Sequence, residues 1–291
     1  MEFLTALLNG LSSGGTYAII AIGYTMVYGI AKMLNFAHGD IIMVGGYAMF
    51  VTLMLIGHPI PALIVAILLC VVLGTCVERF AYRPLRGASP LAVLITAIGV
   101  SSFLQSLAQI IFGTAPKMPT QLQINGTLRL GELRIAYGTL VTLAVTVVVM
   151  VALTLFVKYS KPGRAMVAVS EDRGAAQLMG INTNGIIAIT FAIGSALAAV
   201  AAYLMLMKAP SLTNTLGAMP GIKAFTAAVI GGIGSIPGAM LGGIVLGVIE
   251  AFALSVPVLA PFTDAIEFAV LIVILLVKPA GLLGKARREK V

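Results

Sequence analysis

Long apolar stretches that lack Asp, Glu, Lys and Arg dominate this chain. They cover residues 3–31, 41–77, 87–116, 135–157, 174–207 and 224–249. Each is longer than the roughly 20 residues that an α-helix needs to cross a bilayer. The pattern therefore predicts an all-α fold, a polytopic bundle of transmembrane helices.

The number of spans follows from two further features. The stretch 41–77 is nearly twice the length of one span, and Gly57-His58-Pro59-Ile60-Pro61 interrupts it. Proline and glycine are poorly tolerated inside a helix, so this stretch predicts two spans joined by a tight turn. A last apolar segment covers 265–277, which brings the expected count to about eight.

Composition excludes a soluble protein. Hydrophobic residues make up 60% of the 291 residues and charged residues only 10%, where a soluble domain has about 25% charged residues. The mean hydropathy is +1.09. We expect one membrane-embedded domain over 1–291. The net charge of +8 does not indicate nucleic-acid binding, because the basic residues lie in short segments between apolar runs.

Those basic segments predict the orientation. They lie at 79–86, 158–173 and 285–290, so we expect both loops and the C-terminus in the cytoplasm. The loops 114–137 and 208–222 are then external, as is the N-terminus. This arrangement requires the segment 223–254 to leave from and return to the outside. Its run of glycines from Gly231 to Gly238 predicts a broken or re-entrant helix, and a wrongly assigned loop is the alternative.

Two loops carry local signals. Leu122, Ile124, Leu128 and Leu130 alternate with polar residues around Asn125-Gly126, which predicts an external β-hairpin with a type I′ turn over about 114–137. In the loop 158–183, Ser160 precedes a predicted helix that Gly180 ends. Small residues form one face of that helix beside Glu171, Asp172 and Arg173. The helix lacks the bulky aromatic face and the strongly basic face of a membrane-surface helix, which favours contact with a protein.

Residues with ionisable side chains near the membrane are the next candidates. Asp40, Glu250 and Glu267 would be costly at membrane depth, and such residues are functional candidates by default. His38, Asp40 and Glu267 fall near predicted span ends, so we expect them at the interface. Glu250 is left open between an interfacial and a buried position.

Catalytic signatures are missing from the sequence. It has no phosphate-binding glycine loop and no nucleophile motif, and we expect no metal site because His38 and His58 fall on opposite sides of the membrane. We therefore expect no enzyme activity, and any ATP that drives this protein must be hydrolysed by another polypeptide. Glycines spaced i,i+4, such as Gly10 and Gly14, predict closely packed helices.

A resemblance to a known family covers nearly the whole chain. The spacing Ala175-Ala176-x-x-x-Gly180 resembles the cytoplasmic signature of ABC importer permeases, although the acidic Glu171 lies three positions early and a later Leu-Pro is missing. Five further segments resemble the permease of branched-chain amino-acid ABC importers of the LivH type. They are 16–29, 35–40, 179–182, 223–228 and 231–239.

This resemblance implies a permease subunit in the bacterial inner membrane. It implies a second, homologous permease of the LivM type, two ABC ATPase subunits that hold ATP and Mg, and a periplasmic amino-acid-binding protein. The resemblance implies that the loop helix docks on an ATPase, and we expect the docking residues to be Glu171, Asp172, Ala175, Ala176 and Gly180.

Two other sets of residues are candidates with less defined roles. The translocation pathway or its gate is predicted at Gly231, Gly232, Ser235, Pro237 and Glu250, with close helix packing as the alternative. The motif that contains Asn35, His38 and Asp40 has no assigned role.

Three other function classes stay open at this point. In an ion-coupled secondary transporter of a small neutral solute, Asp40, Glu250 or Glu267 would bind the coupling proton or sodium ion. A channel or structural subunit would move solute only downhill. An intramembrane enzyme is the least supported, because no catalytic set is present.

Overall fold

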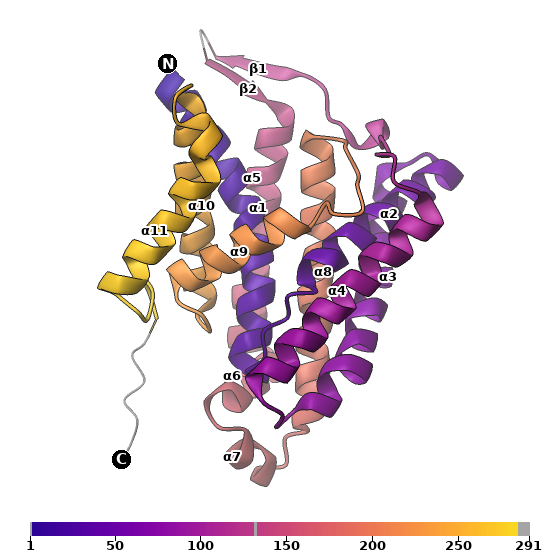
Figure 1. Cartoon of the computed structure of the whole chain (residues 1–291), viewed down its shortest axis with the longest axis vertical. Coiled ribbons are helices and arrows are strands. Elements are labelled where there is room, and N and C mark those ends of the chain that lie inside the picture. Colours follow the sequence, from indigo (N-terminus) through magenta and orange to yellow (C-terminus); the bar gives the residue numbers. More distant parts are fainter. Residues whose placement is uncertain (1, 131–132, 285–291) are drawn as a thin grey trace.

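The computed structural model describes residues 2–130 and 133–284. A single bundle of helices spans its length, and a small β-hairpin lies at one end (Figure 1). The elements are α1 (Glu2–Ala31), α2 (His38–Ile56), α3 (Pro59–Val77), α4 (Pro90–Phe112), β1 (Thr127–Leu130), β2 (Leu133–Ala136), α5 (Tyr137–Tyr159), α6 (Lys161–Glu171), α7 (Arg173–Leu178), α8 (Thr183–Lys208), α9 (Ala218–Gly231), α10 (Ile236–Ser255) and α11 (Thr263–Val277).

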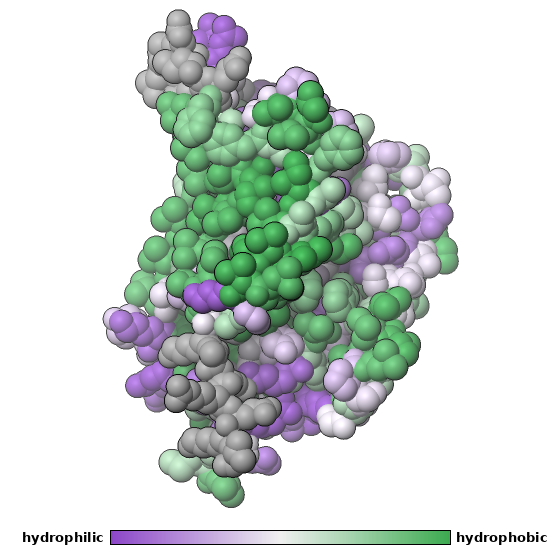
Figure 2. Space-filling model, turned by 60° about the vertical axis from the view of Figure 1, so that its left-hand side comes forward, coloured by the Kyte–Doolittle hydropathy of each residue, from purple (hydrophilic) through white to green (hydrophobic). Residues whose placement is uncertain are grey.

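Within the described residues, eight helices are long and apolar enough to cross a membrane. They are α1, α2, α3 with the short turns that follow it, α4, α5, α8, α10, and α11 with the turn before it. Figure 2 shows a broad hydrophobic surface on one side of the bundle, as expected for helices that face lipid. The predicted class and the predicted count of about eight spans are confirmed.

Helix α1 is the centre of the bundle. It packs against α5, α8, α9 and α10, and most of its apolar part is buried. Its contact with α10 is close because glycines face each other: a Cβ on Gly10 would lie 2.9 Å from the backbone of Val248, and one on Gly14 would lie 2.8 Å from the backbone of Ile244. The predicted packing through glycines is therefore found within the chain itself.

The predicted turn between two spans is present at residues 57–61. Gly57 ends α2 in the left-handed conformation, with φ of 73°. The His58 side chain then accepts a hydrogen bond from the Ile60 backbone N–H at 3.4 Å, and Pro59 is the first residue of α3. Glycine at the end of one helix and proline at the start of the next give this sharp turn its geometry.

The broken segment is also present. Helix α9 has only 14 residues, and it is followed by a turn in which Gly232 and Gly234 have positive φ. The Ser235 hydroxyl then accepts a hydrogen bond from the Gly238 N–H at 3.2 Å and caps α10. In Figure 1, α9 descends to this turn and α10 returns to the end where the N-terminus and the hairpin lie. The chain thus turns back inside the bundle, as the prediction of a broken helix requires.

The prediction of the external hairpin is wrong in two details, the position of its turn and the start of its first strand. The hairpin exists, but its strands β1 and β2 pair Thr127 with Ala136 and Leu130 with Leu133, so the connection lies at 131–132, outside the described residues. Asn125-Gly126 precedes β1, and Leu122 belongs to a short 3₁₀ turn. Alternation of apolar residues extended the predicted strand too far toward the N-terminus, because it cannot distinguish a strand from an extended loop.

Candidate functional site

The loop 158–183 forms two helices where one was predicted. The Ser160 hydroxyl accepts a hydrogen bond from the Gly163 N–H at 2.9 Å and starts α6, as expected. Asp172 then has extended backbone (φ −148°, ψ 112°), and its Oδ1 accepts from the Ala175 N–H at 2.9 Å, so it starts α7. The prediction of one helix is wrong because Asp172 is a strong N-cap in its own right. Glu171 therefore belongs to α6 and does not share a helix face with Ala175.

Helix α7 presents its C-terminal end outward. Leu178 is 91% exposed and Met179 is 82% exposed, and Gly180 follows with φ of 80°. Glu171, Asp172 and Ala175 are exposed as well, whereas Ala176 is buried. Two large apolar side chains next to each other on a loop outside the spans form a surface that favours contact with a protein.

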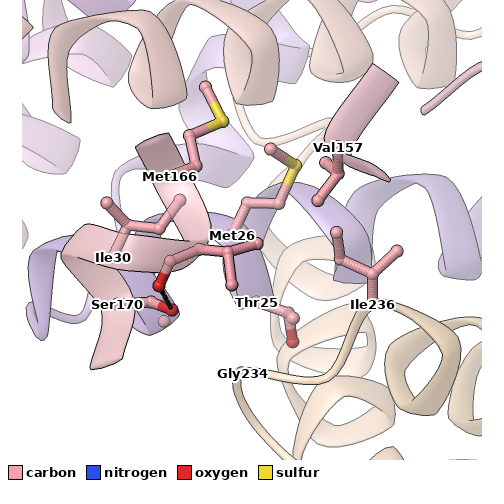
Figure 3. Close-up of a pocket in the computed structure, with 10 residues that line it drawn as sticks. Thr25, Met26, Ile30, Val157, Met166, Ser170, Gly234 and Ile236 are labelled. Carbon is pink, nitrogen blue, oxygen red and sulfur yellow. Dashed lines mark hydrogen bonds between the residues drawn. The ribbon is translucent and has the colours of Figure 1, made fainter. Parts of the chain in front are cut away.

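The inner side of α6 fits against the bundle. Met166 and Ser170 from α6, Met26 and Ile30 from α1, and Gly234 from the α9–α10 turn line a cavity of about 70 Å³ (Figure 3). A Cβ on Gly163 would lie 2.5 Å from the Val157 Cα, so only glycine allows α6 to fold back on α5. The loop 158–183 and the α9–α10 turn were predicted as separate candidate sites. In the structure they meet beside α1.

A second contact joins α7 to the linker between α1 and α2. The Arg173 guanidinium donates a hydrogen bond to the Ala31 carbonyl at 3.2 Å, at the end of α1. Lys32 follows with φ of 57°, a conformation that is uncommon for residues other than glycine. Arg173 and Lys32 also line a cleft of about 690 Å³ at this end of the bundle. Any displacement of α7 would thus act directly on the linker.

Arg86 lies on the wall of the same cleft. Its guanidinium pairs with the Glu78 carboxylate and donates to the Asn184 side chain. Partial burial lowers the pKa of the Arg86 guanidinium, and the neighbouring Glu78 carboxylate opposes this shift. These contacts fix the loop between α3 and α4 to the start of α8.

The motif 35–40 lies inside the bundle, where the linker enters α2. The Tyr82 hydroxyl donates to Asn35 Oδ1 at 2.9 Å, and Gln105 Nε2 donates to Asp40 Oδ1 at 2.8 Å. The His38 ring packs edge-on against the Tyr24 ring at 4.8 Å. His38 is 1% exposed and Asp40 is 3% exposed. Both residues lie in the first turn of α2, near a span end as the sequence predicts, but neighbouring helices bury their side chains.

The starts of α2 and α9 meet at this point. A Cβ on Gly221 would lie 3.2 Å from the Gly39 Cα, and Gly39 and Gly217 touch through their backbones. In Figure 1, both helices begin in the middle of the bundle rather than at its ends. Interrupted helices that begin inside a bundle are a feature of transporter binding and gating regions. We name this contact, made by 35–40 and 217–221, the helix-start junction.

Four charged residues form a cluster that joins α9, α10 and α11. The Lys223 ammonium lies 2.7 Å from Glu250, 2.9 Å from Asp264 and 3.2 Å from Glu267. The Tyr17 hydroxyl donates to the same Glu250 oxygen at 2.9 Å. Glu267 lies near the start of α11, close to a span end as the sequence predicts, but it is 0% exposed because the bundle buries its carboxylate. The role of Lys223 is not among the predictions, although a lone lysine in an apolar helix indicates a buried partner.

The predicted pathway residues do not all lie together. Gly231, Gly232, Ser235 and Pro237 belong to the α9–α10 turn, where Gly231 and Gly238 touch through their backbones. Glu250 lies thirteen residues beyond Pro237, about 20 Å along α10. Within the part of the chain that the structure describes, no group of three or more His, Cys, Asp or Glu residues has the arrangement of a metal site.

Eight spans, interrupted helices that begin inside the bundle and a protruding helical loop define a polytopic membrane transport protein. Residues 6–275 match the family model described as the permease component of branched-chain amino acid transport systems. The chain belongs to this family.

Similar proteins span the full length of the chain. It is 47% identical over 303 residues to the high-affinity branched-chain amino acid transport system permease protein BraD of Pseudomonas aeruginosa, covering 100% of this chain and 98% of that protein. It is 45% identical over 305 residues to the permease protein LivH of Escherichia coli K12, with the same coverage. A probable branched-chain amino acid transport permease of Methanocaldococcus jannaschii is 26% identical over 91% of this chain and 88% of its own length.

Proposed function

We propose that this chain is the membrane-spanning permease subunit of an ATP-driven importer for branched-chain or related neutral amino acids. The observation that carries the proposal is full-length similarity, at 45–47% identity, to permeases named for high-affinity branched-chain amino acid transport. A neutral amino acid needs no opposite charge along its path, only small residues, backbone groups and a passage that opens alternately to each side. The glycine-rich bundle is consistent with that requirement.

The partners in this proposal are a second, homologous permease, two ABC ATPase subunits that bind ATP and Mg, and a periplasmic amino-acid-binding protein. The complex lies in the bacterial inner membrane with the α6–α7 end and the C-terminus in the cytoplasm. Basic residues are concentrated in the loops at that end, including Arg79, Arg83, Lys158 and Arg164, which supports this orientation.

Helix α7 is the proposed docking element for one ATPase. Its exposed pair, Leu178 and Met179, fits a hydrophobic groove, and the exposed Glu171 and Asp172 form the polar margin beside the exposed Ala175. The buried Ala176 holds α7 on the bundle, and the positive φ of Gly180 turns the chain back to α8. Replacing Gly180 by valine should abolish transport while the protein stays in the membrane.

ATP-driven movement of α7 can reach the interior by two routes. One runs from Arg173 to the Ala31 carbonyl and the linker that leads to the helix-start junction. The other runs from α6 through the cavity beside Met26 to the turn at Gly234. Both routes end on interrupted helices, which are suited to alternating access because their ends can shift while the spans stay intact.

The ion-coupled transporter is the alternative. Its candidate residues Glu250 and Glu267 both contact the Lys223 ammonium, which occupies the place that a coupling cation would take. Asp40 is held by Gln105. These contacts favour a structural role for all three carboxylates and so support the ATP-driven reading.

Purification of the tagged chain from its native membrane in mild detergent tests the proposal. We expect the ATPases and the second permease to be recovered with it. The double variant Leu178→Asp, Met179→Asp should lose the ATPases and keep the second permease. The matched control is Met118→Asp, which changes an exposed apolar residue in the connection between α4 and β1 and should keep all partners. Recovery of the chain alone, in detergents that preserve other complexes, would contradict the proposal.

A further inference from the structure

Helix α4 has an exposed face that is unusual for a membrane span. Gly99, Ser102, Ser106 and Gln109 are spaced by three, four and three residues, so they share one side of the helix. All four are exposed, and a Cβ on Gly99 would meet no atom within 4 Å. Within the described residues, the side chains of Ser102, Ser106 and Gln109 make no hydrogen bond. We call these four positions the α4 polar face.

Within the described residues, the spans that precede and follow α4 in the sequence lack a comparable group of exposed polar residues. The exposed residues of α3 include Ile60, Ile64, Leu68 and Val72, and those of α5 include Val147, Val148, Val151 and Leu155. Thr154 of α5 is exposed as well, but its hydroxyl donates to the Met150 carbonyl of its own helix at 2.8 Å. Such surfaces suit contact with lipid tails, whereas the α4 polar face does not.

The position of this face on α4 makes contact with lipid unfavourable. Helix α4 runs from Pro90 to Phe112, so the stretch from Gly99 to Gln109 covers its middle and the part toward Phe112. This stretch is about 15 Å long along the helix axis. Hydrocarbon offers no hydrogen-bond partner to a serine hydroxyl or a glutamine amide at that depth. Small and polar residues on one helix face are the usual composition of contacts between helices in membranes.

We propose that the α4 polar face is the surface on which the second, homologous permease of the complex packs. This inference rests on the proposed function, and it specifies which surface of this chain contacts the second permease. Only a partner that itself crosses the membrane can cover 15 Å of a span, which excludes the ATPases and the periplasmic protein. Helix α4 also has room for a neighbour, since within this chain it packs mainly on α2 and on the turn Glu78–Tyr82.

The same surface lies close to the helix-start junction. Gln105 is on α4 between Ser102 and Ser106, and its amide donates to the buried Asp40 at 2.8 Å and to Ser101 at 3.2 Å. A movement of the second permease against α4 would therefore reach the start of α2 through one side chain. The packing surface and the interior of this chain are mechanically connected.

Photo-crosslinking in the intact complex tests the assignment. The variant Ser106→p-benzoylphenylalanine, irradiated in native membranes, should form an adduct that mass spectrometry identifies as the second permease. The matched control Val148→p-benzoylphenylalanine places the same probe on the exposed side of α5, and it should give no protein adduct. An adduct from Ser106 with lipid alone, or with another copy of this chain, would overturn the assignment.

A second measurement separates this inference from the proposed function. The double variant Ser102→Leu, Ser106→Leu makes the face apolar, and it should lose the second permease on purification while the ATPases are still recovered through α7. Unchanged recovery of the second permease overturns the inference but leaves the proposed function intact. Absence of a second permease from the unmodified complex contradicts the proposed function itself. Rapid reaction of Ser106→Cys with a water-soluble maleimide in the intact complex would also overturn the inference, because the face would then line water.

Discussion

At the scale of single residues, Lys223 determines how the interrupted helix is held. It lies on α9, and its ammonium reaches carboxylates on α10 and α11. Removing charge from water is costly, so buried ions persist only with close partners of opposite sign. Lys223 thereby ties the re-entrant helix to the last two spans, and the carboxylates that looked like ion-binding candidates are the other half of this contact.

The variant Lys223→Met tests this role. It leaves Glu250 and Glu267 without their counter-charge, and breaking a buried pair on one side costs about 3–5 kcal/mol. We expect a lower unfolding temperature in detergent and a lower amount of protein in the membrane. Replacing both glutamates by glutamine in the same chain should restore much of the loss. Lys158→Met, at an exposed position, is the control, and an equal effect of both single variants would exclude the buried pair as the cause.

Gly247 is a second position where one residue decides the packing. A Cβ there would lie 2.7 Å from the Gly10 carbonyl oxygen and would also press on Gly14. Gly247→Leu should therefore separate α1 from α10, at a cost of about 1–3 kcal/mol or more. Thermal unfolding of the purified chain measures this. Gly138→Ala should leave stability unchanged, since its Cβ would lie 3.8 Å from the flexible Met207 methyl group. Tolerance of leucine at 247 would contradict the close contact.

At the scale of elements, the sequence predicts those features that depend on nearby residues, such as spans, turns and helix breaks. The eight spans follow from hydropathy, the turn after α2 from Gly57 and Pro59, and the break before α10 from the glycines at 231–234. The division of α6 from α7 was missed because Asp172 looked like one more polar residue on a helix. The hydrogen bond from the Ala175 N–H to the Asp172 carboxylate depends on a backbone bend, and the spacing of apolar residues does not reveal that bend.

The burial of the candidate residues could not be predicted in the same way. Asp40 and Glu267 lie near span ends in the sequence, which favoured an interfacial position. They are buried because α2 begins inside the bundle and because Lys223 of another helix approaches Glu267. Both facts depend on contacts between distant segments, 44 residues apart for Lys223 and Glu267. The exposed pair Leu178 and Met179 was likewise not recognised, since apolar residues in a helical segment are usually buried.

Asp172→Ala tests whether α7 needs its cap. Loss of the Oδ1 hydrogen bond to Ala175 costs about 1 kcal/mol, a large share for a helix of six residues. We expect faster hydrogen exchange at 175–178 in the intact complex, together with slower transport. Asp172→Asn keeps the cap and removes the charge, so it should exchange slowly. If both variants lose transport while exchange is unchanged, the aspartate acts through a direct charge contact with the ATPase and not through α7.

At the scale of the whole molecule, α7, the linker and the interrupted helices form one connected path. Arg173 joins α7 to the end of α1, the linker leads to the helix-start junction, and Gln105 connects that junction to the α4 polar face. Each contact is made by one or two side chains between spans. Such an arrangement can carry a displacement of α7 to the interior of the bundle.

The energy source of transport distinguishes the proposed ATP-driven importer from the ion-coupled alternative. In proteoliposomes that contain the complete complex and the binding protein, we expect leucine uptake to require ATP on the ATPase side. Ionophores that collapse proton and sodium gradients should leave the initial rate unchanged, because Lys223 already fills the space between Glu250 and Glu267 and Gln105 holds Asp40. The variant Asp40→Asn should keep strict ATP dependence even if its rate falls. Uptake driven by an imposed ion gradient without ATP, and abolished by Asp40→Asn or Glu267→Gln, would instead establish the ion-coupled mechanism and would require that the Lys223 cluster open during transport.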